Sequence, residues 1–535
     1  MTRGATVGID LGTTNSVVAH ADSGGIHVLP NASGHETTPS VVAVTDDGAV
    51  VGRPAANQAV QYPDRTVFSV KRRMGDTENA IRLGGTDYRP EEISALVLEK
   101  LVADAEAALD RPVTSAVITV PAYFNHRQRE ATKRAGVLAG LEVERLLNEP
   151  TAACLAHGLT DRDERLVFVY DLGGGTFDVS LVRVDDGLFE VVATDGETDL
   201  GGDDWDAKIV AGLRNHVRSE TGVDVADDNQ VMQRLWDAAQ QAKHELTTRE
   251  RTTIRLPYLL SGDRTYDLEK RLTREQFESM TDDLLERTVS LCESLLAEAG
   301  VSTGDVDEVV CVGGATRMPM IADRLESLFG RRPVAGTDPD KTVAIGAAAQ
   351  AGVMQEALPA PVATDASVPA NRTSGVDLVP AEDDGHAPAA HPLDDVVLLD
   401  VTAKTLGVET HRDGEPGYFS RHIERNTAVP ATATDTYTTL HDGQTAVTFP
   451  VYQGESSVAA ENELLDEFVI RGIPPAPAGE VEIEVRFELD RDGVLTVSAE
   501  NAESGAAESV TIDSGIEFTD DELSKMRANL PEVRE

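Results

Sequence analysis

Cysteine is scarce in this sequence: Cys154, Cys292 and Cys311 are the three cysteines among 535 residues, and each lies in an apolar neighbourhood. Their spacing matches neither a zinc knuckle nor a redox pair. The chain is also long enough for several domains that each bury their own core, which excludes a small disulfide-stapled scaffold. We therefore expect three buried thiols in a reducing compartment.

Positive charge and long apolar runs are also lacking. The 47 Lys and Arg residues stand against 93 Asp and Glu, a net charge of −46 that repels phosphate backbones and anionic lipid. We predict no nucleic-acid partner and no membrane partner. No run reaches the roughly 20 apolar residues of a membrane span, and no signal peptide precedes the first strand pattern, so a cytoplasmic location is expected.

Over residues 1–354, apolar β-branched runs alternate with long helical patterns, which is typical of an α/β domain with buried strands. Strands are predicted at Val113–Val120 and Val167–Val169, and helices at Glu91–Leu109 and Gln276–Ala299. Residues 355–394 hold six prolines, many Ala and Asp, and no aromatic residue. That composition predicts a disordered tether.

A different pattern follows the tether. Residues 395–402 contain the apolar run Val396–Leu399, which by pattern alone indicates a buried strand. Residues 403–515 carry short alternating runs such as Val481–Phe487 and Val494–Ala499, with turn signals at Asp442-Gly443 and Asp492-Gly493, and so predict a β-sandwich. In 516–535, a capping box at 519–522 opens one short helix that can run only to about 531.

Two glycine-rich segments resemble each other: Gly8–Thr14 and Tyr170–Asp178, in which Asp171 follows Asp10 by 161 positions. This internal similarity predicts a duplicated α/β domain. In each copy a strand delivers an Asp that could hold Mg²⁺, and a Gly/Thr turn exposes N–H groups to a phosphate. A single turn of this kind is more often an ordinary β-hairpin turn, but two copies that face each other favour a phosphate-binding site. No Walker A motif occurs, so a P-loop fold is excluded.

A third glycine turn, Val312–Arg317, follows the predicted strand Val309–Val312 and opens a helix. Its backbone could approach a sugar or base closely, with Arg317 stacked on the base. A plain strand-to-helix connection explains the same residues equally well.

Taken together, the chain resembles a DnaK-type, seventy-kilodalton heat-shock chaperone over nearly its whole length. The segments that carry the resemblance are Gly8–Ser16, Val120–Asn125, Asn148–Ala153, Asp171–Asp178, Gly313–Pro319 and Val396–Thr402. Sugar kinases and actins share the phosphate turns but not the apolar linker and β domain. The resemblance implies a duplicated actin-like (ribonuclease H-like) two-lobed ATPase domain, then a β-sandwich peptide-binding domain and one short C-terminal helix.

For the ATPase domain the resemblance implies ATP or ADP with Mg²⁺, and K⁺ as a further candidate ion. The implied catalytic residues are Asp10, Lys71, Glu149, Asp171 and Thr176, with Asp10, Asp171 and Asp178 around the metal. The implied nucleotide contacts are Gly12, Thr13, Thr14, Asn15, Gly173, Gly174, Gly175, Thr176, Gly201, Gly202, Lys243, His244, Thr247, Gly313, Gly314, Arg317 and Asp340. His244 replaces an arginine of some members, and Gln240 replaces a glutamate.

The resemblance also implies coupling between the domains, a J-domain cochaperone, a nucleotide exchange factor and a monomeric state. The implied coupling residues are Pro121, Arg129, Arg145, Val396, Val397, Leu398, Leu399 and Asp400. An extended hydrophobic peptide would contact Val408, Tyr437, Val447 and Phe449, with His411 and Leu440 arching over it. Phe449 is bulky and His411 polar for these positions, so peptide preference is expected to be shifted.

The expected function is that of an ATP-dependent chaperone that binds and releases hydrophobic peptides. Typical members continue into a helical lid, whereas this sequence stops at Glu535, and Ala478 replaces a lid-latching arginine of some members. Because a lid mainly slows dissociation, fast peptide exchange in every nucleotide state is expected. Two rival functions remain open at this point: an actin-like small-molecule kinase, and a regulatory ATP-switched binding protein of the same fold.

Overall fold

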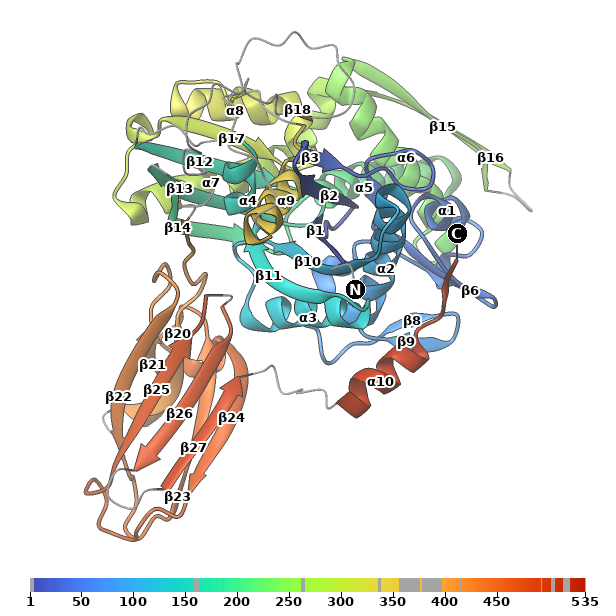
Figure 1. The fold of residues 1–535 in the computed structure, drawn as a ribbon. Helices are drawn as coiled ribbons and strands as arrows, with labels where there is room; N and C mark the ends of the chain where they lie inside the picture. The colour runs from blue at the N-terminus through green and yellow to red at the C-terminus, as the bar shows by residue number, and fades with distance from the viewer. Residues whose placement is uncertain are drawn as a thin grey trace.

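The structure is a computed structural model. It describes residues 4–157, 164–185, 187–260, 265–334, 338–355, 376–377, 397–412, 415–491, 493–501, 506–512 and 520–534. Two α/β lobes lie side by side, and a β-sandwich lies against one end of them (Figure 1). Most of the predicted tether, together with Val396, lies outside the described residues.

Lobe I is built on a sheet of order β11-β10-β1-β2-β3-β18, with β4 beside β2. Its strands are β1 (Ala5–Asp10), β2 (Asn15–Asp22), β3 (Gly25–Val28), β4 (Thr38–Pro39), β10 (Val113–Val120), β11 (Glu142–Asn148) and β18 (Val376–Asp377). A smaller sheet, β28-β6-β5-β7, holds β5 (Val42–Thr45), β6 (Gly48–Val51), β7 (Thr66–Val67) and β28 (Val533–Arg534). The remaining elements are the hairpin β8 (Ile81–Leu83) and β9 (Thr86–Tyr88) and the helices α1 (Arg53–Gln58), α2 (Pro90–Leu109) and α3 (His126–Leu138).

Lobe II repeats this plan on a sheet of order β17-β12-β13-β14-β19. Its strands are β12 (Arg165–Leu172), β13 (Phe177–Asp185), β14 (Leu188–Glu197), β17 (Glu308–Val312) and β19 (Val397–Leu399). Its helices are α5 (Gly202–Thr221), α6 (Asn229–Thr248), α7 (Arg274–Ala299) and α8 (Pro319–Phe329), and β15 (Arg251–Leu260) with β16 (Tyr266–Thr273) forms a hairpin. Just as β1 is antiparallel to β2 and parallel to β10, β12 is antiparallel to β13 and parallel to β17.

Helices α4 (Glu149–Ala156) and α9 (Thr342–Met354) pack against each other between the two sheets (Figure 1). The approach is so close that only glycine fits at two positions. A Cβ on Gly8 of β1 would lie 2.1 Å from the backbone nitrogen of Ala348, and one on Gly346 would lie 1.8 Å from the carbonyl oxygen of Ala152. This packing positions the end of β1 and the start of α4, which supply residues of the site described below.

The sandwich pairs the sheet β21-β20-β23-β24 with the sheet β22-β25-β26-β27, as the alternating pattern predicts. Its strands are β20 (Leu406–Arg412), β21 (Glu415–Ile423), β22 (Ala431–Thr438), β23 (Ala446–Gln453), β24 (Glu463–Arg471), β25 (Glu482–Leu489), β26 (Leu495–Asn501) and β27 (Ala506–Ile512). In β25, Ile483, Val485 and Phe487 are fully buried, whereas the residues between them are exposed. This alternation packs one face of the sheet into the core.

Helix α10 (Asp520–Asn529) does not pack on the sandwich core. Its Met526 is buried against Ala95 of α2 and Leu138 of α3, so the helix lies on lobe I (Figure 1). Val533 of β28 then pairs in parallel with Ala49 of β6. Among the helices that the structure describes, none is long and apolar enough to cross a membrane.

Candidate nucleotide site and interdomain contact

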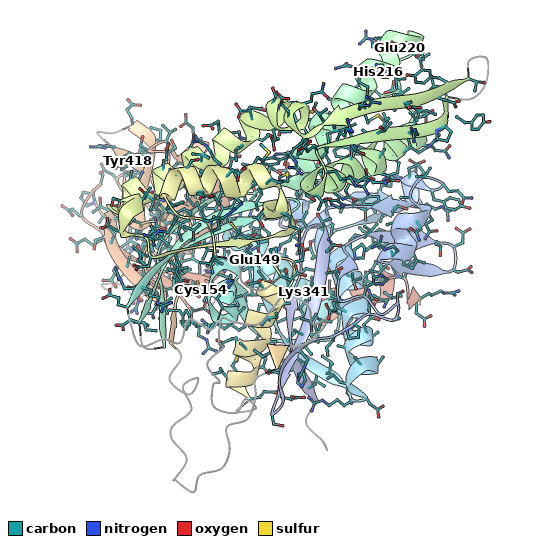
Figure 2. All side chains as sticks on the ribbon, turned by 90° about the horizontal axis from the view of Figure 1, so that it is seen from above. Glu149, Cys154, His216, Glu220, Lys341 and Tyr418 are labelled. Carbon is teal, nitrogen blue, oxygen red and sulfur yellow. The ribbon has the colours of Figure 1, made fainter. Side chains whose placement is uncertain are left out.

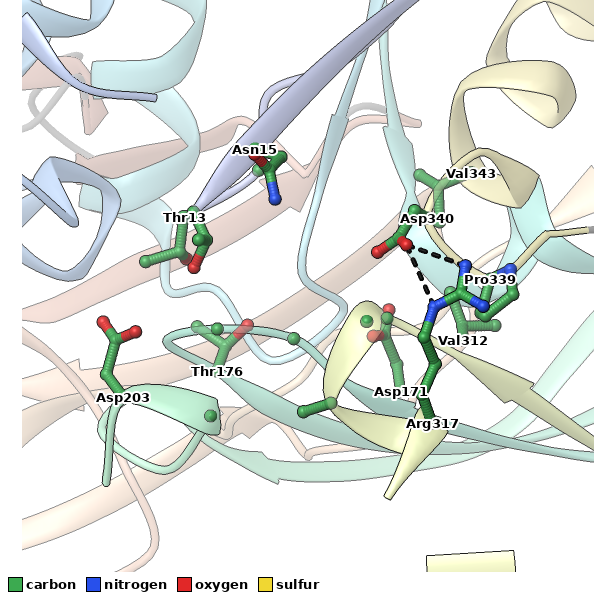
Figure 3. Close-up of a pocket in the computed structure, with 18 of the residues that line it drawn as sticks. Thr13, Asn15, Asp171, Thr176, Asp203, Val312, Arg317, Pro339, Asp340 and Val343 are labelled. Carbon is green, nitrogen blue, oxygen red and sulfur yellow. Dashed lines mark hydrogen bonds and ion pairs between the residues drawn. The ribbon is translucent and has the colours of Figure 1, made fainter. Parts of the chain in front are cut away.

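A cavity of about 370 Å³ lies between the lobes, where the turns after β1 and β12 face each other (Figure 3). The predicted residues that line it are Asp10, Gly12, Thr13, Thr14, Asn15, Lys71, Glu149, Asp171, Gly173, Gly174, Thr176, Gly202, Lys243, His244, Thr247, Gly313, Gly314, Arg317 and Asp340. The structure thus brings together residues that are hundreds of positions apart in the sequence. Of the predicted residues, Gly175, Gly201 and Asp178 do not line the cavity.

Glycines allow the first phosphate turn to close on itself and the second phosphate turn to approach it. A Cβ on Gly12 would lie 2.0 Å from the carbonyl oxygen of Asn15, and one on Gly174 would lie 1.7 Å from Thr14 Oγ1 of the opposite turn. The Thr14 hydroxyl is buried and has no hydrogen-bond partner among the described residues. Because buried polar groups are nearly always paired, this orphan hydroxyl fits a ligand oxygen such as that of a phosphate.

Lys71 and Glu149 form a buried ion pair at the floor of the cavity. Lys71 comes from a short 3-10 helix of lobe I, and its Nζ donates to Glu149 Oε1 at 2.7 Å. Glu149 is the first residue of α4, where the helix dipole favours a carboxylate, and it lies in the interior of the molecule (Figure 2). Burial lowers the pKa of Lys71, but the nearby Glu149 and Asp10 outweigh it and raise that pKa, so the amine stays charged.

Three carboxylates surround this pair: Asp171 and Asp178 are buried, and Asp10 is half-buried. Burial, reinforced by Glu149, raises the pKa of Asp10 and that of Asp178 to about 7, and it raises the pKa of Asp171 well above its usual range. Crowded carboxylates of this kind favour a bound cation. No group of three metal-ligating side chains gathers among the described residues, but Mg²⁺ needs only one or two carboxylates beside substrate phosphates and water. The donor set therefore fits Mg²⁺ held together with a nucleotide.

The far end of the cavity carries the residues predicted for adenosine. Arg317 lies beside Asp340, with Nη2 and Oδ2 2.8 Å apart (Figure 3). Lys243 is buried and donates to Asp206 Oδ2 at 2.7 Å, so its charge is already paired within lobe II. Burial, and then the charge of Lys243, lowers the pKa of His244. A neutral imidazole can stack on a base, but it lacks the cation–π attraction of an arginine.

Sequence reasoning missed the contacts that join the lobes across the cavity. Ser69 Oγ donates to Asp203 Oδ2 at 2.6 Å. Arg72 donates to the carbonyl oxygen of Gly175 at 3.0 Å and to Asp204 Oδ2 at 2.5 Å. The only sequence signal was the acidic first turn of α5 directly after a Gly-Gly pair, which could accept from a basic residue. These contacts hold the second phosphate turn against lobe I.

The predicted linker adds a strand to lobe II. β19 pairs in parallel with β14, with Val397 opposite Leu188 and Leu399 opposite Glu190. The Leu398 side chain packs against the core between the two lobes. Next to the linker, Thr151 Oγ1 of α4 donates to Asp400 Oδ1 at 2.9 Å, and both residues are buried. Asp400 therefore contacts the helix that begins with Glu149.

Of the other predicted coupling residues, Arg129 lies where lobe I meets the sandwich, because it lines a pocket together with Gly493 and Leu495 of the sandwich. Arg129 donates to Asn148 Oδ1 at 2.7 Å, next to Glu149 in sequence. Pro121 is buried at the end of β10, and Arg145 lies in β11 with its Nε buried and without a hydrogen-bond partner among the described residues.

Direct polar contacts join the sandwich to both lobes, and sequence reasoning did not single them out. On lobe I, Asn125 Nδ2 donates to Glu463 Oε2 at 2.7 Å. On lobe II, Arg425 Nη2 lies 3.0 Å from Glu298 Oε2, and Asn426 Oδ1 accepts from the Thr194 backbone nitrogen at 3.0 Å.

The residues predicted to bind peptide divide into two groups. Val408 and Phe449 belong to the sandwich core, and Tyr437 and Val447 pack against that core. His411 and Leu440, predicted to arch over a peptide, are both exposed. Val408 and Phe449 are buried in this structure, so a peptide could reach them only if neighbouring side chains moved, and peptide binding by these six residues stays a prediction.

His422 of β21 lies beside this apolar set and was not predicted. Its Nε2 lies 2.8 Å from the Tyr437 hydroxyl, which donates to Ser420 Oγ at 3.0 Å, and its ring stacks on Phe487. Its Nδ1 is buried without a hydrogen-bond partner among the described residues. Burial lowers the pKa of His422 to about 4, so the ring is neutral at pH 7.

Comparison with known proteins agrees with this architecture of a two-lobed cleft joined by a strand to a sandwich. The family model described as Hsp70 protein matches residues 6–83, 76–363 and 386–535. The proteins named chaperone protein DnaK from two strains of Halobacterium salinarum, R1 and NRC-1, are each 47% identical over 522 residues, 97% of this chain and 77% of theirs. The chain therefore belongs to the Hsp70 family, which confirms the resemblance and the predicted fold class.

Proposed function

We propose that this protein is an ATP-dependent chaperone that binds and releases exposed hydrophobic peptide segments. The observation that carries the proposal is the strand pairing of β19 with β14, which makes the linker to the sandwich part of the ATPase lobe. Family membership and the name of the two DnaK relatives support the chaperone class and ATP hydrolysis in general. A small-molecule kinase would need neither the linker strand nor the sandwich.

In the cleft, each residue has a distinct task. The glycine turns and Thr14 hold the phosphates of ATP through N–H and hydroxyl donors. Mg²⁺, held by Asp10 or Asp171 together with the phosphates, would neutralise charge on the nucleotide. Lys71 adds a positive charge next to the phosphate that is transferred, and Glu149 orients both Lys71 and a water for in-line attack.

Coupling runs through groups that touch both the cleft and the linker. Helix α4 begins with Glu149 in the cleft and carries Thr151, which donates to Asp400 after the linker strand. A shift of Glu149 upon hydrolysis would therefore move the hydrogen-bond donor for Asp400. Release of β19 from β14 would then free the sandwich, a population shift that depends on contacts made in only one of the two states.

An extended hydrophobic peptide is proposed to lie over Tyr437, Val447 and Phe449, between the exposed His411 and Leu440. Backbone hydrogen bonds would provide affinity, and the apolar set would select side chains. A J-domain cochaperone and a nucleotide exchange factor are proposed as partners on the family resemblance alone. Fast peptide exchange in every nucleotide state stays a prediction, which fluorescence anisotropy with a labelled peptide would check.

The test is the rate of ATP hydrolysis with and without an excess of a short hydrophobic peptide. We expect the peptide to stimulate the native chain and to have no effect on the double variant Leu398→Asp/Leu399→Asp, because charges there cannot pack beside β14. The matched control is Val334→Asp, an exposed apolar residue of lobe II. A native chain that ignores peptide, or a control that loses stimulation equally, would contradict the proposed coupling.

A further inference from the structure

The β15–β16 hairpin is basic in a chain that is otherwise strongly acidic. Residues 249–274 contain seven Lys or Arg and four Asp or Glu, a net charge of +3, whereas the whole chain carries −46. The hairpin projects from lobe II away from the body of the molecule (Figure 1). The residues of this hairpin belong neither to the nucleotide cleft nor to the interdomain contact. A basic segment on an exposed projection therefore indicates a separate binding surface.

The register of the hairpin gathers these charges on one face. Thr252 and Ile254 of β15 are buried, so Arg251 and Arg255 point to the opposite, exposed face. Arg271 of β16 stands opposite Thr253, between them. With Arg249 at the end of α6, they line an open groove of about 530 Å³, which we call the arginine groove. Its lining is Glu245, Arg249, Arg251, Thr252, Thr253, Arg255 and Arg271.

The positive charge of the arginine groove is only partly neutralised. Arg249 lies 3.4 Å from Glu245, and Arg255 lies 3.4 Å from Glu269. Both arginines are about two-thirds exposed, and exposed pairs of this kind contribute little. Arg251 and Arg271 make no ion pair with any described residue. The groove therefore has arginine N–H donors without an acidic partner among the described residues, and such donors suit carboxylate oxygens.

We propose that the arginine groove binds an extended acidic segment of a partner protein. Alternate residues of a strand lie roughly 6.5 Å apart, so Arg251, Arg271 (opposite Thr253) and Arg255 follow one another at the spacing of carboxylates on every second residue of an extended segment. A single-stranded nucleic acid would need aromatic side chains on which its bases could stack, and the groove lining has none. A compact anion would reach only some of these arginines, because they are spread along the strand.

The test uses a fluorescein-labelled peptide of ten residues in which Glu and Ser alternate, titrated with the full chain at low and high salt. We expect saturable binding at low salt that weakens as salt screens the charges. The variant Arg251→Glu/Arg271→Glu should weaken binding at least tenfold. The control Arg82→Glu/Arg332→Glu reverses two exposed arginines elsewhere, changes the net charge equally, and should change binding less than twofold.

Further measurements decide between the possible occupants. A peptide with five Glu followed by five Ser should bind more weakly than the alternating one, and ATP hydrolysis by the groove variant should equal that of the native chain, which shows that it is folded. Tighter binding of oligo-dT or of inorganic tripolyphosphate than of the peptide would overturn the proposal. So would an equal loss of binding in the groove variant and the control, because that would reveal only an effect of net charge.

Discussion

The nucleotide cleft and the contact between lobe II and the sandwich both depend on ion pairs, but they hold them in different environments. In the cleft, the side chains of Lys71 and Glu149 are 6% and 8% exposed. At the interdomain contact, those of Arg425 and Glu298 are 20% and 40% exposed. Breaking a buried pair costs roughly 3–5 kcal/mol, and breaking an exposed pair costs roughly 0–1 kcal/mol. The cleft is thus suited to fixed chemistry, and the contact is suited to repeated separation.

The largest effect is expected from Lys71→Ala. Loss of the buried amine removes the positive charge beside the transferred phosphate, so hydrolysis should fall by at least about 100-fold while much of the nucleotide binding remains. Single-turnover hydrolysis and nucleotide titration measure the two effects. Lys208→Ala, which breaks an exposed pair with Asp283, is the control and should leave both unchanged. A native rate for Lys71→Ala would show that the buried pair has no catalytic role.

The next effect concerns the buried His422 in the sandwich. Its pKa falls from 6.5 to about 4 on folding because burial disfavours the charged ring. The folded state then binds fewer protons than the unfolded state between these values, so stability is lost as pH falls from about 6.5 to about 4, by at most about 3 kcal/mol.

His422→Leu should remove this part of the pH dependence. Both tryptophans, Trp205 and Trp236, lie in lobe II, so their fluorescence does not report on the sandwich. Hydrogen exchange of the β25 amides at pH 4.5 and 7 measures the stability of the sandwich instead. An unchanged pH dependence in the variant would show that other groups control the acid lability of this domain.

A smaller effect is expected where the interdomain pair is partly exposed. Arg425→Ala should weaken docking by about 1 kcal/mol, a roughly fivefold shift, and should speed hydrogen exchange of the β19 amides by that factor. The control is Arg421→Ala in β21, four residues before Arg425, where the arginine donates within the sandwich to the carbonyl oxygen of Glu455. A loss of docking free energy as large as that expected for a buried pair would show that the two regions do not differ in the strength of their ion pairs.

The smallest effect is expected for an ion pair in which both side chains are mostly exposed. Arg255 and Glu269 expose 68% and 66% of their side chains. Arg255→Ala should therefore change the free energy of unfolding by less than about 0.5 kcal/mol, as chemical denaturation would measure. A larger loss would mean that exposure alone does not rank these pairs.

Local patterns determined much of the fold. The apolar run at 113–120 forms β10, and the predicted helix at 91–109 is α2 with one more residue at its start. Such elements are predictable because side-chain periodicity reflects the buried face of a strand or helix. The β-sandwich was likewise predictable from alternation and turns, and the two phosphate turns from glycines whose missing Cβ atoms the turns require.

The pairing of distant residues was decided only by the tertiary structure. Lys71 and Glu149 are single charged residues with no local signal, and packing of the two lobes around α4 and α9 makes them partners. The same holds for Ser69 and Asp203, and for the pairing of β28 with β6. Sequence periodicity indicates which side of a helix or strand is buried. It does not indicate which other element that side packs against, because that choice depends on long-range packing and on desolvation, which no local pattern encodes.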